Sequence, residues 1–453
     1  MLLRDALAVK RGDIITIVGA GGKTTTMFRL ARELTEDGWR VVTTTTTLIR
    51  PREGRRGERL IVESEQNRLL AQISGAMDEH RHVTVASQRL MKRGDRLPRL
   101  GGITPELVAA IGDLPAVDAV IVEGDGCRGR LLKAPADHEP VVPRDTTILV
   151  PMAGVDALGR PLTEQWVHRP ERVARLAGVS LGDEITPQVV ADTLADTRGG
   201  LKGVPEGARV VPLINKVEGH DRLAGARQIA ERLLGSPVVD RVVLGAVLRP
   251  EPVVETWGRI AAVILAAGGS TRFGSDKLLA LWGEGTIIEH VTDTVLASGA
   301  DEVIVVQGHD ADKTRAILGD RPVRTVINEQ WAQGLSTSVR AGLNAVNASA
   351  HAALFVLADK PAVTTEDIAA VMTGYRTTLA PIVVPTYDGQ PGNPVLFDRA
   401  LFGELASIEG DEGGRQLRAA YADRVHHVAV ASPGILLDID TPADYERVAA
   451  SYA

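Results

Sequence analysis

Cysteine, aromatic residues and long apolar runs are scarce in this chain, and each shortage excludes a class of protein. Cys127 is the single cysteine, which rules out an internal disulfide framework and suits a reducing cytoplasm. No run of about 18 apolar residues and no secretory signal core occurs, so a membrane span is not expected. A net charge of −7 and 3% aromatic residues argue against a nucleic-acid surface, which needs basic patches and stacking rings. We therefore predict a cytoplasmic protein that binds neither nucleic acid nor membrane.

Apolar runs alternate with helical patterns in two successive stretches of the chain. A length of 453 residues predicts two or three domains. Strands are predicted at residues 13–18, 41–45, 83–86, 119–122, 147–150 and 210–214, and then at 261–265, 302–306, 324–327, 353–357 and 382–384. Such alternation is typical of an α/β fold with a mostly parallel sheet covered on both faces. Pro250 and Pro252 interrupt the pattern, so we expect one unit over residues 1–250 and another over 258–453.

A glycine-rich loop follows the first strand of the second stretch. Its residues are Leu265, Ala266, Ala267, Gly268 and Gly269, followed by the cations Arg272 and Lys277. Glycines let the backbone approach a phosphate closely, and two cations can neutralise a triphosphate. The glycines by themselves are also compatible with a tight turn that binds no ligand. The two cations that follow favour a phosphate-binding loop.

Four further segments of the second stretch carry polar or acidic side chains. They are residues 328–338, which include Gly334, Ser336 and Ser338, residues 357–361 with Asp359, residues 392–397, and residues 438–442 with Asp440. Mg²⁺ takes oxygen ligands from one or two carboxylates and from substrate phosphates. Asp359 and Asp440 are candidate ligands because open α/β sheets place their ligand crevice at the carboxyl ends of strands. The alternative for Asp440 is an N-cap of the last helix, and capping of the helix that follows is likewise the alternative for Ser336 and Ser338.

The order and spacing of the five segments resemble the molybdenum cofactor cytidylyltransferases (MocA-like proteins). The resemblance implies a Rossmann-like nucleotidyltransferase domain of the GT-A-like type. It implies that the nucleotide is bound by residues 265–269, Gly334, Ser336 and Ser338. It also implies that Arg272, Lys277 and Asp359 are catalytic and that Asp359 and Asp440 hold Mg²⁺.

The choice of base and two departures from the family pattern concern single residues. Ala267 stands where related guanylyltransferases usually carry a second glycine, which favours CTP as the substrate. Lys360 replaces the usual Met or Gln, and either adds charge beside the metal or points to solvent. Asn393 stands where the family often has His, so an acid–base role is not expected there.

A second glycine loop opens the first stretch of the chain. It comprises Gly19, Gly21, Gly22, Lys23 and Thr24, after a predicted strand and before a predicted helix. In a P-loop, amides and the helix dipole face phosphates in this setting. Residue 17 is Ile instead of the first glycine of that pattern, and the loop is closer to the Gly-Thr-x-Gly-Lys-Thr form of Mur ligases. We predict ATP or GTP binding, with Lys23 on the β/γ-phosphates and Thr24 near Mg²⁺; a structural turn with a capping Thr is the alternative.

Two more segments of the first stretch accompany this loop. Glu123 and Asp125 follow an apolar strand as in a Walker B segment, so Asp125 or Glu123 is a candidate Mg²⁺ ligand through water. Residues 215–218 resemble the guanine-reading Asn-Lys-x-Asp of GTPases, but Glu218 replaces the aspartate, so we expect a solvated strand end there. Together with residues 132–140, these segments resemble the YqeC-like accessory family linked to selenium-dependent molybdenum hydroxylases. The first unit is therefore predicted to be a P-loop-like three-layer domain.

These resemblances imply a protein that matures the molybdenum cofactor. The second unit would transfer CMP from CTP to the phosphate of molybdopterin, and the first would bind a nucleotide and assist a client molybdenum hydroxylase. One alternative is a nucleotidyltransferase that uses GTP or a sugar phosphate. The other is a non-catalytic carrier that inserts the cofactor and uses the P-loop as a nucleotide switch.

Overall fold

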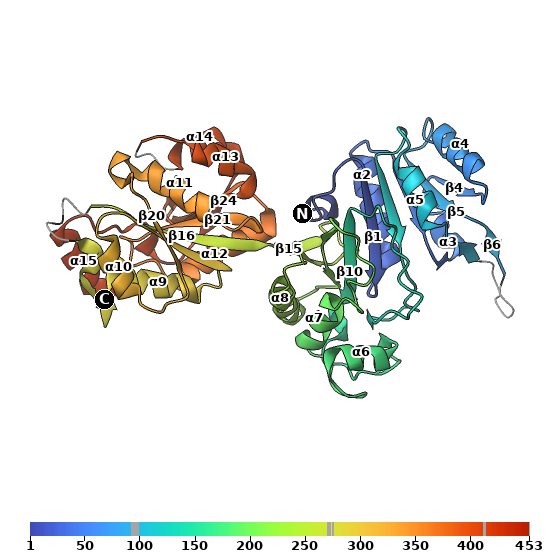
Figure 1. The fold of residues 1–453 in the computed structure, drawn as a ribbon, viewed down its shortest axis with the longest axis horizontal. Helices are drawn as coiled ribbons and strands as arrows, with labels where there is room; N and C mark the ends of the chain where they lie inside the picture. The colour runs from blue at the N-terminus through green and yellow to red at the C-terminus, as the bar shows by residue number, and fades with distance from the viewer. Residues whose placement is uncertain (92–98, 270–272, 274–275, 411–413, 453) are drawn as a thin grey trace. The chain divides into compact units, whose positions relative to one another are not determined.

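The structure is a computed structural model that describes residues 1–91, 99–269, 273, 276–410 and 414–452. The chain forms two compact units, Met1–Trp257 and Gly258–Ala453. Each unit is built on its own large sheet (Figure 1). Within the described ranges, no helix is long and apolar enough to cross a membrane.

The large sheet of the first unit is parallel except at one edge. Its order is β15 (Val253–Trp257), β14 (Val242–Gly245), β13 (Leu213–Asn215), β10 (Ile148–Gly154), β1 (Asp13–Gly19), β8 (Ala119–Glu123), β2 (Val41–Thr45), β5 (His82–Ala86) and β4 (Arg59–Val62), with β12 (Arg209–Val210) beside β10. Only the edge strand β15 pairs antiparallel in this described sheet, with β14. The register places Ile17 of β1 opposite Glu123 of β8, so the carboxyl ends of these strands lie side by side.

Helices cover both faces of this sheet. Ile15 and Ile17 belong to the core with α2 (Lys23–Glu36), whereas Ile14 belongs to the core with α4 (Gln66–Ala76) and α5 (Pro105–Gly112). A separate core holds α6 (Pro170–Ala177), α7 (Pro187–Ala195) and α8 (His220–Leu234). Strands buried on both faces are apolar throughout, which explains the apolar runs of the sequence. The predicted α/β fold class is confirmed.

One predicted strand is divided in the structure. Residues 210–214 form the ends of β12 and β13, which are separated at Val211 and Pro212. Proline lacks the N–H that a central strand must donate, so the ladder breaks there. The prediction of a single strand was wrong because an apolar run alone does not show where a donor is missing.

The large sheet of the second unit mixes both strand directions. Its order is β20 (Arg324–Ile327), β19 (Glu302–Gln307), β16 (Arg259–Ala266), β21 (Ala350–Leu357), β24 (Val395–Asp398), β22 (Ile382–Tyr387) and β23 (Gln390–Pro391), with β25 (Val425–Ala429) beside β22. β16 pairs parallel with both β19 and β21, whereas β24 is antiparallel to β21 and β22. The loops that follow β16 and β21 therefore leave the sheet at the same edge.

Successive residues of β16 enter different cores. Ile264 packs in the core of α9 (Ile287–Ala297), α12 (Thr365–Thr378) and α15 (Pro442–Tyr452). Val263 packs in the core of α11 (Leu335–Ala345), α13 (Phe402–Ala406) and α14 (Arg415–Ala420). Gly342 of α11 lies directly on Val263, because a Cβ there would collide with the valine side chain. This close approach sets the position of α11, which begins at the predicted nucleotide-binding residues.

Replacement of Gly342 should test this packing. Gly342→Ala forces a methyl group against the stiff, fully buried Val263 and is expected to destabilise the second unit by about 1–3 kcal/mol. Gly403→Ala is the matched control, since no heavy atom lies within 4 Å of its added Cβ. The control should stabilise its helix by about 0.5–1 kcal/mol. Chemical denaturation measures both, and equal effects of the two variants would contradict the packing argument.

Candidate functional site

The phosphate loop of the first unit lies between β1 and the N-terminus of α2. Gly19, Gly21 and Gly22 have φ values of 91°, 84° and 123°, in the left-handed region that favours glycine. Added Cβ atoms at Gly19 and Gly21 would collide with the backbone of β10 at Met152 and Gly154. The glycines are therefore required by the packing of the loop on the sheet as well as by any ligand.

Lys23 is the first residue of α2 and its side chain is buried. Its Nζ donates to the Gly19 carbonyl oxygen at 2.7 Å and lies 3.2 Å from Asp125 Oδ1 and 3.8 Å from Glu123 Oε1. Burial opposes the charged form of Lys23, but Asp125 and Glu123 outweigh it and raise the pKa of the ammonium. The lysine therefore remains a cation, as phosphate binding requires.

Alternating charges continue from Lys23 into the interior. The Asp125 carboxylate accepts from the Gly19 N–H at 3.1 Å and forms an ion pair with Lys133 Nζ at 2.7 Å. Lys133 also pairs with Glu139, which in turn pairs with Arg169. Burial acts to raise the pKa of Glu139, but its contacts with Lys133 and Arg169 prevail and lower it. Low-dielectric burial makes each of these charges depend on its neighbours.

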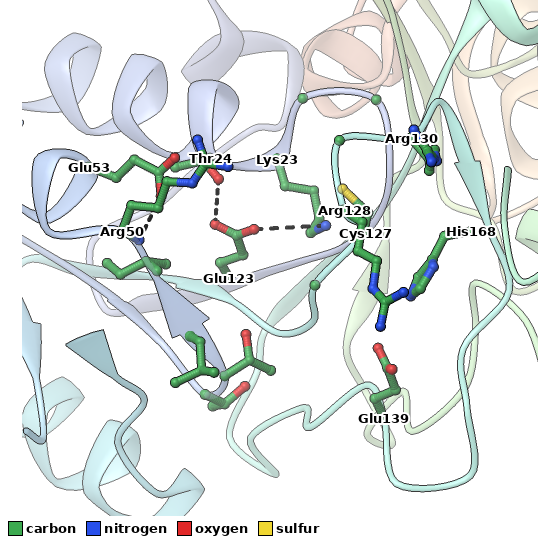
Figure 2. Close-up of a pocket in the computed structure, with 18 of the residues that line it drawn as sticks. Lys23, Thr24, Arg50, Glu53, Glu123, Cys127, Arg128, Arg130, Glu139 and His168 are labelled. Carbon is green, nitrogen blue, oxygen red and sulfur yellow. Dashed lines mark hydrogen bonds and ion pairs between the residues drawn. The ribbon is translucent and has the colours of Figure 1, made fainter. Parts of the chain in front are cut away.

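Glu123 and Thr24 contact each other beside this loop. Thr24 Oγ1 donates to Glu123 Oε2 at 2.7 Å, and burial raises the pKa of the Glu123 carboxyl. Figure 2 shows Glu123 between Thr24 and Lys23. Asp125 faces the two buried lysines, so Glu123 is the carboxylate beside the predicted Mg²⁺ position of Thr24.

Asn215 holds the loop from the opposite side, which the sequence interpretation missed. It is 3% exposed, so the expected solvated strand end at residues 215–218 was wrong for this residue. Its Nδ2 donates to the Gly21 carbonyl oxygen at 2.8 Å, and its Oδ1 accepts from the N–H groups of Lys216 and Val247. With both amide atoms used in this way, Asn215 acts as a support of the loop.

A cavity of about 810 Å³ opens over the phosphate loop (Figure 2). This volume lies within the range of small-molecule sites, roughly 300–1,000 Å³. Its wall contains more cations than anions: the acids are Glu53, Glu123 and Glu139, and the cations are Lys23, Arg50, Arg99, Arg128, Arg130, Arg169 and Lys216. The arginines of this wall were not identified from the sequence, because they come from segments without a motif.

The second unit brings together three of the predicted site residues. Lys277 Nζ donates to Asp359 Oδ2 at 2.7 Å and to the Ile439 carbonyl oxygen at 2.8 Å, and lies 3.4 Å from Asp440 Oδ1. Asp359 follows β21, and Asp440 precedes α15. The Asp359 carbonyl oxygen accepts from the Ile439 N–H at 3.0 Å, which joins the two acidic segments. Segments far apart in sequence thus converge at the edge where β16 and β21 end.

The glycine loop after β16 is packed against an aromatic ring. Leu265 and Ala266 end the strand, Ala267 is buried, and Gly268 is exposed. A Cβ at Gly269 would lie 2.9 Å from Trp331 Cζ3, so glycine is required by the ring as well as by a phosphate. Arg272 lies outside the described residues.

The start of α11 is held by side-chain hydrogen bonds. Gly334 has a φ of 114°, and the helix begins at Leu335. Ser336 and Ser338 are buried, and Ser338 Oγ accepts from Asn328 Nδ2 at 3.0 Å. Asn328 Nδ2 also donates to Thr337 Oγ1, at 2.8 Å. These bonds fix the turn, and nucleotide binding by Gly334, Ser336 and Ser338 stays a prediction.

Lys360 lies beside the acidic residues and not in solvent. It is 5% exposed, and its Nζ is 4.0 Å from Asp438 Oδ1. Burial lowers the pKa of Lys360 despite the opposing pull of Asp438, Asp359 and Asp440. The structure thus favours the first alternative, a further cation next to the carboxylates.

The donor set of the second unit fits a Mg²⁺ ion that arrives with its substrate. Among the described residues, no group of three or more His, Cys, Asp or Glu side chains is placed to hold a metal ion. Asp359 and Asp440 supply hard oxygen donors, and both lie against the Lys277 ammonium. Two carboxylates completed by phosphate oxygens are a usual environment of Mg²⁺.

Comparison with known proteins finds a family for each unit. A profile of the YqeC protein family matches residues 15–171, and a profile of the MobA-like NTP transferase domain matches residues 262–425. The uncharacterized protein YqeC of Escherichia coli (strain K12) is 31% identical over 48% of this chain and 80% of its own length. The two profiles match different families, one in each unit, and the similarity to YqeC agrees with the first.

Two further relatives match the second unit. The molybdenum cofactor cytidylyltransferase of Escherichia coli (strain K12) is 30% identical over 41% of this chain and 93% of its own length. The nicotine blue oxidoreductase of Paenarthrobacter nicotinovorans is 29% identical over 34% of this chain and 79% of its own length.

The fold, the lysine–carboxylate cluster and these matches define the second unit as a nucleotidyltransferase. The chain belongs to the YqeC family through its first unit and to the MobA-like NTP transferase family through its second. Both predicted family resemblances are confirmed.

The buried charges around Asp125 give a stability prediction. Asp125→Asn leaves Lys23 and Lys133 without a shared carboxylate and is expected to destabilise the first unit by roughly 3–5 kcal/mol. Asp137→Asn removes an exposed partner of Arg172 and should leave stability unchanged. Hydrogen exchange of the β1 and β8 amides reports on this unit. Equal exchange rates in both variants would contradict a structural role for the ion pairs that Asp125 forms with Lys23 and Lys133.

Proposed function

We propose that the second unit transfers CMP from CTP to the phosphate of molybdopterin, giving molybdopterin cytosine dinucleotide and pyrophosphate. The observation that carries the proposal is the cluster of Lys277, Asp359 and Asp440 at the carboxyl edge of the sheet. Similarity to a molybdenum cofactor cytidylyltransferase over most of that protein's length supports the acceptor. Ala267, which stands where related guanylyltransferases usually carry a second glycine, supports CTP over GTP.

The residues of the cluster suit this reaction. An oxygen of the acceptor phosphate attacks the α-phosphorus, the bond to the bridging oxygen breaks, and pyrophosphate leaves with the electron pair. Negative charge accumulates on phosphoryl oxygens, so fixed cations lower the barrier. Lys277 offers such a cation beside Asp359, and the Lys360 Nζ lies near the same acidic segments, 4.0 Å from Asp438 Oδ1. Asp359 and Asp440 would hold Mg²⁺, which when bound neutralises phosphate charge.

Pyrophosphate release tests this proposal. The wild-type protein, given Mg²⁺ and molybdopterin, should release pyrophosphate from CTP in preference to GTP or ATP. Asp359→Asn is expected to lower the rate roughly 100-fold, because it removes a proposed Mg²⁺ ligand and the carboxylate that orients the Lys277 ammonium. Asp423→Asn, at an exposed position of the same unit, is the matched control and should keep the wild-type rate.

Three results would contradict the proposal. Preference for GTP would favour a guanylyl transfer, and release with a sugar phosphate in place of molybdopterin would favour a sugar nucleotide synthesis. No release from folded protein with intact acceptor would favour the carrier function or a redox reaction of the kind named for the Paenarthrobacter relative.

For the first unit we propose binding of ATP or GTP at the phosphate loop, in support of a client molybdenum hydroxylase, which we expect to be selenium-dependent. The amide of Gly22 and the Lys23 ammonium would hold the phosphates. Thr24 and Glu123 would face Mg²⁺, which when bound neutralises phosphate charge. The support for this proposal is the glycine loop between a parallel strand and a helix of 14 residues, with a charged lysine at the helix start.

Two lysine variants should separate the two nucleotide sites. Lys23→Met should weaken ATP or GTP binding about tenfold or more through loss of a charge-assisted hydrogen bond, and should leave CTP binding unchanged. Lys277→Met should weaken CTP binding and leave ATP or GTP binding unchanged. Equilibrium dialysis with each labelled nucleotide measures both affinities. Thr24→Ala keeps the buried lysine and provides a second test, because nucleotide binding to this variant should no longer depend on Mg²⁺. Unchanged ATP or GTP binding in both Lys23→Met and Thr24→Ala would refute the site.

A further inference from the structure

The cavity of the first unit carries a second group of cations beside the phosphate loop. We propose that Arg128, Arg130 and Arg169 form an anion site for a phosphomonoester, which the unit binds together with the nucleotide. This inference rests on the proposed nucleotide at the loop and adds a second ligand to it.

Two chain segments build the group. Arg128 and Arg130 lie between β8 and β9 (Leu132–Lys133), and Arg169 follows β11 (Val167–His168). β9 and β11 pair in parallel with Leu132 opposite Val167, which holds the two segments side by side. The Arg130 carbonyl oxygen accepts from the Gly21 N–H at 3.1 Å, so this wall is attached to the phosphate loop.

Arg128 and the residues near it lie at a different end of the cavity from Arg50 and Glu53. Figure 2 shows Arg128, His168 and Glu139 on one side of Lys23, and Arg50 and Glu53 on the other. The loop already supplies amides, a helix N-terminus and Lys23 for a triphosphate. The arginines are therefore additional to what the nucleotide needs.

The charge of this wall is not balanced by the protein. Arg169 pairs with Glu139, and Lys133 pairs with Glu139 and Asp125. Within the part of the chain that the structure describes, the guanidinium groups of Arg128 and Arg130 form no ion pair or hydrogen bond with protein. Two uncompensated positive charges in a cavity match the charge of a phosphomonoester dianion, and guanidinium groups bind phosphate oxygens in pairs.

The backbone supports a ligand-binding role for the same residues. Arg128 and Arg169 have φ values of 52° and 64°, in the left-handed region that residues with a Cβ rarely adopt. Lys216, on the same cavity, has a φ of 66°. Such conformations cost free energy and concentrate at binding sites, where they aim a side chain.

His168 reports the positive potential of the wall. Burial and the neighbouring cations Arg169, Lys133 and Arg128 lower its pKa to about 4, and Glu139 opposes them weakly. The imidazole is therefore neutral near pH 7. A dianion bound among the arginines would favour the imidazolium and raise this pKa, which gives a spectroscopic signal independent of activity.

The experiment uses the full chain saturated with Mg²⁺ and a non-hydrolysable ATP or GTP analogue, so that the loop is filled. Inorganic phosphate is titrated by calorimetry, and the His168 resonance is followed by NMR. We expect phosphate to bind and the His168 pKa to rise. Arg128→Gln should weaken phosphate binding about tenfold or more, with nucleotide affinity within about twofold of wild type. Arg175→Gln, an exposed position on α6, is the matched control and should change neither.

Three outcomes would overturn the inference. One is absence of phosphate binding to the nucleotide-loaded protein. Another is equal weakening of nucleotide and phosphate by Arg128→Gln, which would assign the arginines to the nucleotide. The third is malonate binding as tightly as phosphate, which would replace the phosphomonoester by a dicarboxylate. If no nucleotide binds the loop, the proposed function of the unit fails, whereas Arg128-dependent phosphate binding would still support the second site.

Discussion

A lysine ammonium held between two carboxylates organises the site of each unit. Lys23 lies against Asp125 and Glu123, and Lys277 against Asp359 and Asp440. In both units, parallel strands end at this point and bring distant segments to one edge. The sequences around the two lysines differ, but both arrangements meet the same physical requirement: an ammonium group withdrawn from water needs carboxylate partners.

Close packing sets where these charges can lie. Gly19 and Gly21 are confined by β10, Gly269 by Trp331, and Gly342 by Val263. Each glycine removes a side chain at a place where a loop or helix must approach the sheet. The loops are thus positioned by sterics before any ligand contributes, which is the kind of preorganisation that electrostatic catalysis needs.

The sequence was sufficient for the fold class and for residues that belong to local patterns. Asp359 was predicted at the end of a strand and follows β21, whereas the same prediction was wrong for Asp440, which lies between the short helix Pro433–Leu436 and α15. The family resemblance assigned both aspartates and Lys277 to one site, and the structure brings the three together. The sequence did not predict the ion pairs of Glu139 with Lys133 and Arg169. These pairs depend on a short two-stranded sheet that joins distant segments. The antiparallel insertion of β24 was missed for the same reason: strand order is a property of tertiary contacts, whereas periodicity is local.

The ammonium between Asp359 and Asp440 has a consequence for which ions can enter the site. The single charge of the Lys277 ammonium offsets one of the two carboxylates, so a divalent cation that enters alone must displace the lysine with no anion to receive it. A cation escorted by a triphosphate brings oxygens to which the lysine can turn. Under the proposed function, Lys277 therefore favours joint entry of metal and nucleotide over entry of a metal ion alone.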